Sequence, residues 1–310
     1  MSNYRQTKTQ RVLSCTKPSL MVPGCAVGMI LCAALGLVLA QCKGNHPKDQ
    51  SGRTISSGAA KRKPGRVLLV GGEIYPQPAM KKFVEWAGGK RARILVVMWG
   101  GMDHDGGTFN RFSRNIKDFE PAVIRRGVSI KDIVTPEGRA EFLRQMNTST
   151  GIFFTGGDQT TIMQTIMAAR LREALNEKYN GGMVFAGNSA GAAMMSRTML
   201  TGDTTNDGIV PDTLVLSKGL GLINSGIVDQ HFIERHRQNR LLSALMKSDE
   251  TWAVGVDEGS AVAVQDERFL EVLGESYAMI FTQTDNRTLL KLNLLPAGKT
   301  LDLLTLQPTR

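Results

Sequence analysis

Short runs with the character of buried strands, each ended by glycine or polar residues, constrain the fold of this chain more than any other feature. Each run is too short for an ordinary helix, and an amphipathic segment at residues 79–87 separates the first two. Strands that alternate with helices pair in parallel through crossovers, so the pattern predicts an α/β fold with a parallel sheet. The runs are residues 67–70, 94–98, 151–155, 183–186, 226–232 and 252–256.

The C-terminal part of the chain has a different pattern. From about Ala261, the residues alternate in type, first over residues 261–264 (Ala-Val-Ala-Val) and then over residues 269–272 (Phe-Leu-Glu-Val). This period of two predicts antiparallel strands that close one edge of the sheet.

The positive charge of the chain is confined to its N-terminal segment. The formal net charge is +10, and residues 1–66 carry 11 Lys or Arg with a single acid, Asp49, whereas the remainder holds 27 basic and 27 acidic residues. A nucleic-acid-binding face needs a basic patch on the folded part. The charge distribution therefore argues against a nucleic-acid partner.

Residues 1–42 have the features of an export leader. Four basic residues lie before residue 18, and no charged residue occurs from Pro18 to Cys42. Residues 39–42, Leu-Ala-Gln-Cys, resemble a bacterial lipobox, in which Cys42 becomes the lipidated first residue, although Gln41 departs from the small residue of that motif. An uncleaved membrane anchor is the alternative, because the uncharged run is long enough to span a bilayer.

Either alternative predicts an exported protein, membrane-anchored or periplasmic or extracellular. Residues 43–65 are polar, basic and rich in Gly and Ser, so we expect a flexible linker before a catalytic domain at residues 66–310. All four cysteines precede residue 43. A disulfide framework, a cysteine-ligated zinc ion and a cysteine nucleophile are thereby excluded from that domain.

Gly187-Asn188-Ser189-Ala190-Gly191 lies between a strand-like run and a stretch of good helix formers. This is the G-x-S-x-G pattern of a nucleophile elbow, in which small residues allow a sharp turn that exposes the serine hydroxyl. The free N–H groups of the following helix point toward the place where an oxyanion would form. The alternative is an ordinary strand–helix turn with a surface serine.

A second glycine-rich turn, Gly156-Gly157-Asp158-Gln159, directly follows the strand-like run at residues 151–155. Such a turn lets backbone N–H groups approach a ligand closely, although it is also compatible with a plain βα turn. In a parallel sheet the two turns lie side by side at the carboxyl edge, where sites form. We therefore expect Gly157 and Ala190 to provide an oxyanion hole.

A serine nucleophile needs a base, and the predicted domain contains three histidines. His231 ends a strand-like run and is the leading candidate, because His236 lies between two arginines and is more typical of a solvated position. His104 lies between Asp103 and Asp105 in a loop, where a metal site is a minor alternative to a solvated segment. We expect no metal ion and no cofactor.

The base needs an acid to orient it, and Asp257 and Glu258 both follow the strand-like run at residues 252–256. Either carboxylate could reach the imidazole, so the residues alone leave this choice open. The chain order of serine, histidine and acid differs from that of the α/β-hydrolases and disfavours that fold.

Arg235, Arg237 and Arg240 follow the histidine on a predicted helix. They could be a solvated face, but an arginine fork is suited to binding carboxylates. Their position next to the candidate base is the most direct indication of the substrate.

Four motifs together resemble the serine peptidase family of cyanophycinase and peptidase E, over roughly residues 66–305. They are Gly156-Gly157-Asp158-Gln159, Gly187-Asn188-Ser189-Ala190-Gly191-Ala192, Asp229-Gln230-His231-Phe232 with Arg235, Arg237 and Arg240, and Asp257-Glu258-Gly259. The resemblance implies a class I glutamine amidotransferase-like (flavodoxin-like) fold of three layers, with a mostly parallel central sheet and helices on both faces. Asn188 departs from the family, in which threonine is common at this place.

The resemblance also implies roles for single residues. Ser189 is the implied nucleophile, His231 the base and Glu258 its partner. The implied substrate-binding residues are Gln159, Asp229, Gln230, Arg235, Arg237 and Arg240. The implied reaction is hydrolysis of cyanophycin, a poly-aspartate with arginine amide-linked to its side chains, into β-Asp-Arg dipeptides.

Three functions follow as hypotheses. The first is an exported cyanophycin-degrading serine exopeptidase, the second a peptidase E-like dipeptidase that acts on Asp-X peptides, and the third a non-catalytic surface lipoprotein that binds peptides. The triple arginine and the pair Asp229-Gln230 favour the first, and any turnover would exclude the third. A homodimer is left open.

Overall fold

The computed structural model describes residues 65–101, 107–202, 208–284 and 289–309, which belong to one compact unit, Ala59–Arg310. The predicted leader with Cys42 lies outside the described residues, as do nearly all of the predicted linker and the His104 loop. Within the described part of the chain, no helix is long and apolar enough to cross a membrane.

The main sheet has nine strands in the order β15-β14-β11-β10-β1-β5-β4-β2-β3. Five neighbouring strands run parallel, as the alternation of strand and helix predicts. The four inner strands are mostly apolar and buried, because both of their faces are covered, whereas the edge strand is only partly buried and ends in two arginines. The parallel strands are β1 (Arg66–Val70), β2 (Arg93–Val97), β3 (Val123–Arg126), β4 (Gly151–Phe154) and β5 (Val184–Asn188).

The antiparallel strands predicted for the C-terminal part extend this sheet beyond β1. β10 pairs with β1 in a register that sets Leu69 opposite Val262, and β11 continues the antiparallel order. Two short strands complete the edge. These four strands are β10 (Ser260–Gln265), β11 (Phe269–Gly274), β14 (Thr300–Asp302) and β15 (Gln307–Thr309).

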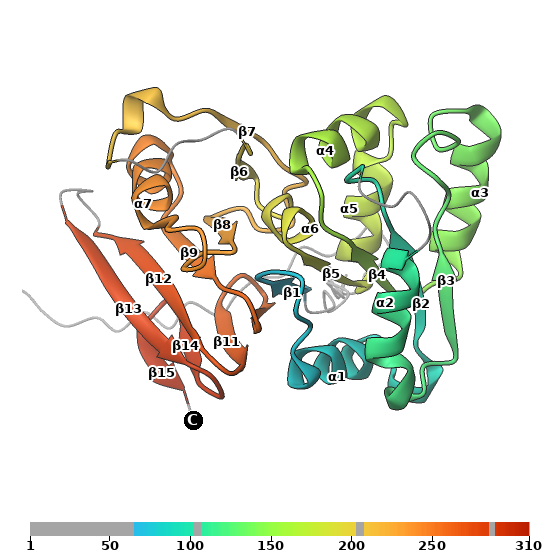
Figure 1. Cartoon of the computed structure of the whole chain (residues 1–310), viewed down its shortest axis with the longest axis horizontal. Coiled ribbons are helices and arrows are strands. Elements are labelled where there is room, and N and C mark those ends of the chain that lie inside the picture. The colour runs from blue at the N-terminus through green and yellow to red at the C-terminus, as the bar shows by residue number, and fades with distance from the viewer. Residues whose placement is uncertain (1–64, 102–106, 203–207, 285–288, 310) are drawn as a thin grey trace, which may run out of the picture. The chain divides into compact units, whose positions relative to one another are not determined.

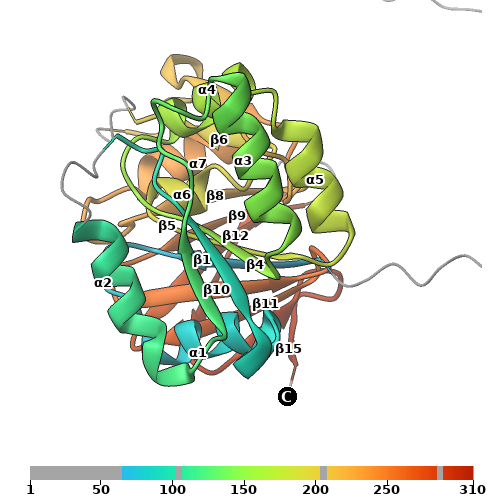
Figure 2. The same ribbon diagram turned by 90° about the vertical axis from the view of Figure 1, so that its right-hand side faces the viewer.

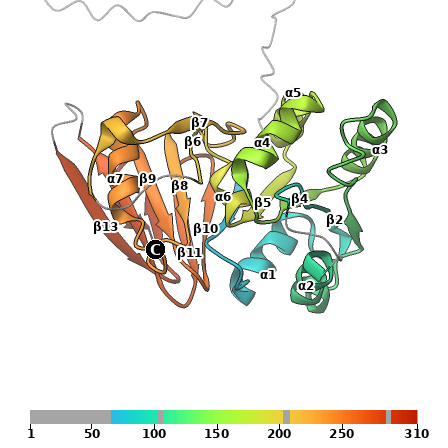
Figure 3. The ribbon, with the colours of Figure 1, turned by 45° about the horizontal axis from the view of Figure 1, so that its top comes forward.

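Helices cover both faces of the parallel strands, and Figures 2 and 3 show the resulting three layers. Neighbouring residues of a strand point to opposite faces, so Phe153 packs with Phe83 and Phe112 of the α1–α2 side, whereas Phe154 packs with Phe142 of the other side. The three-layer α/β architecture expected from the sequence is confirmed. The helices are α1 (Gln77–Trp86) and α2 (Gly107–Ile116) on one face, and α3 (Pro136–Asn147), α4 (Gln159–Ala168) and α5 (Arg172–Asn180) on the other.

A second sheet of four strands, in the order β13-β12-β9-β8, lies beside the main sheet (Figure 1). Its strands are β8 (Gly226–Gln230), β9 (Trp252–Val256), β12 (Tyr277–Gln283) and β13 (Leu290–Pro296). Val228 and Val254 on one face share a core with Leu69 and Val262 of the main sheet, and α7 (Gln238–Lys247) covers the other face.

This second sheet corrects one expectation. β8 and β9 pair in parallel as predicted, but they pair with each other rather than with the central sheet. On its other side, β9 pairs antiparallel with β12. Apolar runs indicate that a strand is buried, but they do not specify the sheet to which it belongs.

The remaining elements connect these layers. The one-turn helix α6 (Ala190–Ala193) follows β5 and contacts both β5 and β8, so it lies between the two sheets. The other short elements are β6 (Thr198–Leu200), β7 (Leu216–Lys218) and the 3₁₀ turns Gly89–Arg91, Lys117–Phe119 and Pro211–Thr213.

Candidate active site

Ser189 occupies a sharp turn between β5 and α6. Its backbone has φ 51° and ψ −121°, a conformation that non-glycine residues rarely adopt and that marks stored strain. The turn is held by the Ser189 N–H, which donates to the carbonyl of Val70 at 2.9 Å, and by the Ser189 carbonyl, which accepts from Ala192 and Ala193. The elbow predicted from the sequence is therefore present, although the helix after it is a single turn.

His231 reaches the serine from the second sheet. It follows β8 directly, has φ 45°, and its N–H donates to the carbonyl of Gly71 at 2.7 Å, which ties the end of β8 to the end of β1. The imidazole Nε2 lies 2.8 Å from the Ser189 Oγ, and both residues are buried. Histidine and serine thus meet at the carboxyl ends of strands from two different sheets.

Glu258 is the acid that contacts the histidine. Its Oε1 lies within hydrogen-bond distance of the His231 Nδ1, and its Oε2 accepts from the Glu73 N–H at 3.1 Å. A Cβ at Gly72 would lie 2.1 Å from that Oε2, so only glycine allows the carboxylate this close to the β1 turn. With Nδ1 donating to the carboxylate, Nε2 is the acceptor for the serine hydroxyl proton.

Asp257, the other acid of the pair, faces a different group. Its Oδ1 accepts from the N–H groups of Ile233 and Glu234 at 3.0 and 3.1 Å, and so it caps the turn that follows the histidine. Of the two carboxylates that the residues alone left open, Glu258 is the one that contacts the imidazole in the structure.

The surroundings of His231 favour its neutral form. Burial lowers the pKa of His231 below its ordinary value, and the positive charge of Arg235 lowers it further, while Glu258 opposes both effects. A neutral imidazole is the form that can accept a proton from serine.

The glycine-rich turn after β4 lies against the nucleophile. A Cβ at Gly156 would be 3.2 Å from the Cβ of Ser189, and the parallel pairing of β4 with β5 sets Phe154 opposite Gly187. Asp158 caps α4 through the N–H groups of Thr160 and Thr161, and its own N–H donates to the carbonyl of Gly100 at 3.0 Å. The two turns lie side by side, as the sequence predicts.

Among the polar residues predicted to bind substrate, Gln230 approaches the nucleophile most closely. Its Oε1 lies 3.5 Å from the Ser189 Oγ. The Gln159 amide instead donates to the carbonyl of Leu200 at 3.0 Å, and this side chain is buried. Gln159 therefore joins α4 to β6, behind the site.

Asp229, Arg237 and Arg240 form a buried ionic cluster. Arg240 Nε donates to Asp229 Oδ2 at 2.7 Å, its Nη2 contacts the other carboxylate oxygen, and each of the two residues is at most 2% exposed. Arg237 Nη1 donates to the carbonyl of Gln230 at 2.6 Å and lies 3.6 Å from Asp229. Burial lowers the pKa of Arg237 to about 10, which leaves the guanidinium charged at neutral pH.

This cluster differs from the expectation for three substrate-binding arginines on one helix. α7 begins at Gln238, so Arg235 lies in the preceding turn and Arg237 immediately before the helix, and only Arg240 is helical. Asp229 and Arg240 contact each other rather than the solvent. The sequence pattern could not show this, because the contact depends on how α7 packs on β8. That packing places the Asp229 carboxylate where it accepts hydrogen bonds from Arg240. Arg235 is exposed.

The sequence did not predict a group of contacts around Asn188, the residue that precedes Ser189. Tyr75 donates to the Oδ1 of Asn188 at 3.3 Å, and the Asn188 amide donates to the carbonyl of Gly72 at 3.1 Å. Burial raises the pKa of Tyr75 to about 12, so its hydroxyl stays protonated as a donor. The sequence signal at this place is Gly71-Gly72 after β1, which marks the end of a strand but does not indicate these contacts.

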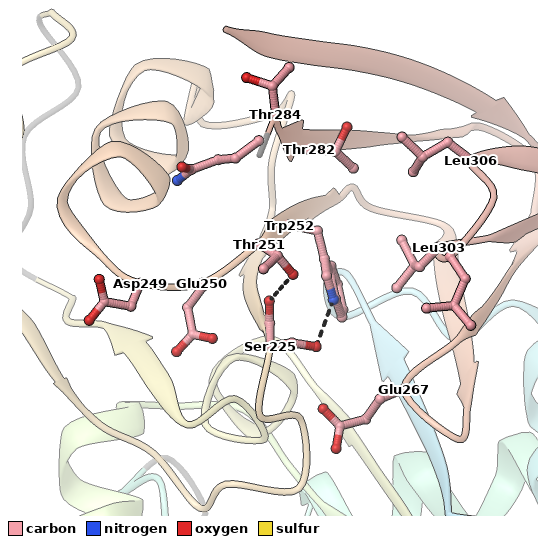
Figure 4. Close-up of a pocket in the computed structure, with 12 residues that line it drawn as sticks. Ser225, Asp249, Glu250, Thr251, Trp252, Glu267, Thr282, Thr284, Leu303 and Leu306 are labelled. Atoms are coloured by element: carbon pink, nitrogen blue, oxygen red, sulfur yellow. Dashed lines mark hydrogen bonds between the residues drawn. The ribbon is translucent and has the colours of Figure 1, made fainter. Parts of the chain in front are cut away.

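These residues adjoin a small cavity of about 110 Å³ next to the nucleophile. Its lining includes Gly156 and Asn188, which flank Ser189 in space and in sequence, together with Glu73 and Arg111. A larger cavity of about 560 Å³ lies elsewhere, where Trp252 Nε1 donates to Ser225 at 3.1 Å (Figure 4). Ser189, His231 and Glu258 do not line this larger cavity.

No group of three or more His, Cys, Asp or Glu side chains suited to a metal ion occurs among the described residues. The hydrogen-bonded arrangement of Ser189, His231 and Glu258 offers nucleophilic chemistry by a serine, with a neutral histidine as base and a carboxylate that orients it.

Comparison with known proteins gives a consistent assignment. A family model described as peptidase family S51 matches residues 105–272. The chain is 29% identical over 227 residues to a cyanophycinase of Trichormus variabilis, covering 71% of this chain and 74% of the relative. It is also 29% identical over 222 residues to a cyanophycinase of Geminocystis herdmanii, covering 69% and 79%.

Solved structures share the fold at low sequence identity. A peptidase from an acI-B1 Actinobacterium has a TM-score of 0.60 and 17% identity, covering 77% of this chain and 97% of that one. A putative peptidase E from Listeria monocytogenes has a TM-score of 0.51 and 13% identity, covering 69% and 100%. These likenesses confirm the expected class I glutamine amidotransferase-like fold.

Proposed function

The chain belongs to peptidase family S51 and is a serine peptidase, and we propose that it hydrolyses cyanophycin to β-Asp-Arg dipeptides. The observation that carries this proposal is the continuous hydrogen-bonded chain from Ser189 through His231 to Glu258, built at the strand ends of two sheets. Relatives named cyanophycinase, similar over about 70% of this chain, support the substrate class.

In the first half of the reaction, the Ser189 Oγ attacks the carbonyl carbon of the scissile amide while its proton moves to the His231 Nε2. The negative charge that develops on the carbonyl oxygen is stabilised by the backbone N–H groups of Gly157 and Ala190. His231 then gives the proton to the leaving nitrogen, the C–N bond breaks, and an acyl-enzyme remains on Ser189.

In the second half, water attacks the acyl carbon and gives its proton to His231. The proton returns to the Ser189 Oγ as the acyl–oxygen bond breaks, which releases the product with a new carboxylate. Glu258 holds the imidazole in one orientation and stabilises the imidazolium that forms in both halves.

The charged residues around the site fit a substrate that carries carboxylates and guanidinium groups. Arg235 is exposed near the base, and a guanidinium is suited to binding a substrate carboxylate. Gln230 lies beside the nucleophile, and the buried pair of Asp229 and Arg240 fixes the backbone that carries Gln230 and His231. We assign this pair to positioning and Gln230 and Arg235 to contact with the substrate.

Location outside the cytoplasm is part of the same proposal. The basic, then uncharged and apolar N-terminal segment and the cysteine-free remainder support export, with Cys42 as the site of a lipid anchor. An exported enzyme of this type would degrade cyanophycin that it meets outside the cell.

Product analysis tests the substrate assignment. The full chain, purified in detergent, is incubated with cyanophycin and with a set of Asp-X dipeptides, and the products are identified by mass spectrometry with Ser189→Ala as the control. We expect β-Asp-Arg dipeptides from the wild type and none from the control. Turnover of Asp-X peptides with cyanophycin left intact would instead support the peptidase E-like alternative.

A further inference from the structure

The small cavity beside the nucleophile has a floor made largely of main chain. Gly156 and Gly157 of the β4 turn and Gly100 at the end of β2 line it, and Asn188 of the elbow forms one side. Since Gly156 also touches Ser189, a group held in this cavity lies next to the reacting serine. The space of about 110 Å³ suits a carboxylate and a few attached atoms, but not a whole long side chain.

Arg111 of α2 supplies the positive charge of this cavity. Its Nη1 donates to Glu73 Oε2 at 2.7 Å, and this ion pair is partly exposed. Its Nε is buried, and it has no hydrogen-bond partner among the residues that the structure describes. The side chain as a whole is 40% exposed and lines the cavity, so part of the guanidinium can be reached by an anionic ligand.

The positions of His231 and Arg111 on either side of Ser189 indicate which part of the substrate binds in the cavity. Figures 1 and 3 show β8, which ends just before His231, and α2, which contains Arg111, on either side of α6. His231 must face the leaving nitrogen in order to protonate it. The residue that becomes attached to Ser189 then extends toward the cavity lined by Gly156 and Arg111.

We propose that Arg111 forms a carboxylate-binding subsite for the acyl-side residue of the substrate. The free edge of its guanidinium binds the carboxylate, and Glu73 holds the guanidinium in place. The inference rests on the proposed function and names a substrate contact within that site. In cyanophycin the carboxylate belongs to the arginine on the acyl-side aspartate, and in an Asp-X peptide it is the aspartate side chain itself.

The test compares each substrate with a partner that has an amide in place of this carboxylate. The first pair consists of two β-Asp-Arg units joined through the aspartate backbone (the β-Asp-Arg dimer) and its analogue in which the acyl-side arginine is an argininamide. The second pair consists of Asp-Leu and Asn-Leu. For the full chain, Arg111→Gln should lower kcat/KM by about 10- to 100-fold on the carboxylate substrates, mainly through KM, the size expected for a lost charge-assisted hydrogen bond. On the amide analogues it should change kcat/KM by no more than about threefold, because the contact is missing there already.

Two further variants make the result specific. Arg111→Lys keeps the charge but loses the fork, so it should recover only part of the loss. Arg114→Gln, which removes an exposed arginine from the same helix, should match the wild type on all four substrates. Equal losses on carboxylate and amide substrates, or no loss on either, would overturn the proposal.

The reaction of Ser189 with a fluorophosphonate probe separates this proposal from the proposed function. The probe requires the nucleophile and base but not the subsite, so Arg111→Gln should be labelled as fast as the wild type. If the wild type hydrolyses Asp-Leu but not the β-Asp-Arg dimer, the cyanophycin assignment fails. The comparison of Asp-Leu with Asn-Leu then still tests whether Arg111 binds the carboxylate. Slow labelling of Arg111→Gln would assign Arg111 to the structure of the site and overturn its role in binding.

Discussion

At the scale of single residues, the protonation of His231 decides whether Ser189 can be activated. Burial and the nearby charge of Arg235 both lower the pKa of the imidazole, and Glu258 acts in the opposite direction. Arg235 is therefore expected to act on the base at a distance as well as on the substrate. The ordinary histidine pKa is about 6.5, so activity should persist below that pH.

The pH profile of kcat/KM tests this effect. A positive charge disfavours the imidazolium, so removing it with Arg235→Gln should raise the pKa of His231 and move the acidic limb of the profile to higher pH. Arg144→Gln, which removes a distant exposed charge paired with Glu141, should leave the limb in place. A limb that stays in place or moves to lower pH in Arg235→Gln would contradict the electrostatic account.

The pair of acids after β9 gives a second test at this scale. Glu258→Gln should lower kcat by roughly 10⁴, the loss seen when a triad carboxylate becomes an amide, because the wrong imidazole tautomer is then favoured. Asp257→Asn keeps the oxygen that accepts from Ile233 and Glu234, so kcat should change little. The kcat values of the two variants are compared by steady-state kinetics on one substrate. A larger loss of kcat in Asp257→Asn than in Glu258→Gln would assign Asp257 as the acid.

At the scale of elements, the ion pair between Asp229 of β8 and Arg240 of α7 joins a strand to the helix that covers it. Both side chains are buried, so each neutralises a charge that would otherwise be very unfavourable inside the protein. The same carboxylate accepts from the N–H of Gln230, one residue before the base. The pair thereby links the packing of α7 to the position of His231.

Unfolding in urea tests the contribution of this pair. Arg240→Ala should lower the free energy of unfolding by about 3–5 kcal/mol, because it removes the guanidinium that is hydrogen-bonded to the buried Asp229 carboxylate. Arg235→Ala, at an exposed position, should change it by no more than about 0.5 kcal/mol. Equal small effects of the two substitutions would show that Asp229 and Arg240 are not coupled in solution.

The elements also show how much could be predicted from the sequence. The apolar runs predicted the buried strands, and the glycine-rich turns predicted that Ser189 and Gly156 lie together, because both signals are local. The separate sheet of β8 and β9 could not be predicted, since it depends on packing between distant segments. The resemblance to the family predicted Glu258, but the residues alone did not favour it over Asp257, because the position of Glu258 depends on Gly72 and Glu73, about 185 residues earlier in the chain. Arg111 was missed because an arginine on a helix is ordinary until a cavity lies beside it.

At the scale of the whole molecule, charge and cysteine are unevenly distributed along the sequence. Residues 1–66 carry the whole net charge of +10, and all four cysteines precede residue 43. The proposal of an exported enzyme rests on this distribution, because it assigns the targeting information to residues 1–42 and leaves the remainder without a thiol to oxidise.

Metabolic labelling with a fatty-acid probe tests the fate of Cys42. We expect the wild-type chain to take up the label and Cys42→Ser to take up none and to accumulate as a precursor of different size. Cys32→Ser, which removes a cysteine from within the apolar run, serves as the matched control and should be labelled normally. A wild type that takes up no label would assign the segment to a plain anchor or a cleaved signal peptide.

The central claim is that the whole assembly of two sheets acts through an acyl-enzyme on Ser189, and mass spectrometry of the quenched reaction tests it most directly. The full chain is mixed with cyanophycin, stopped with acid within the first turnovers and digested. The account predicts a β-Asp-Arg acyl adduct on the peptide that contains Ser189, and neither adduct nor product from Ser189→Ala. Continued cyanophycin hydrolysis by Ser189→Ala would contradict it.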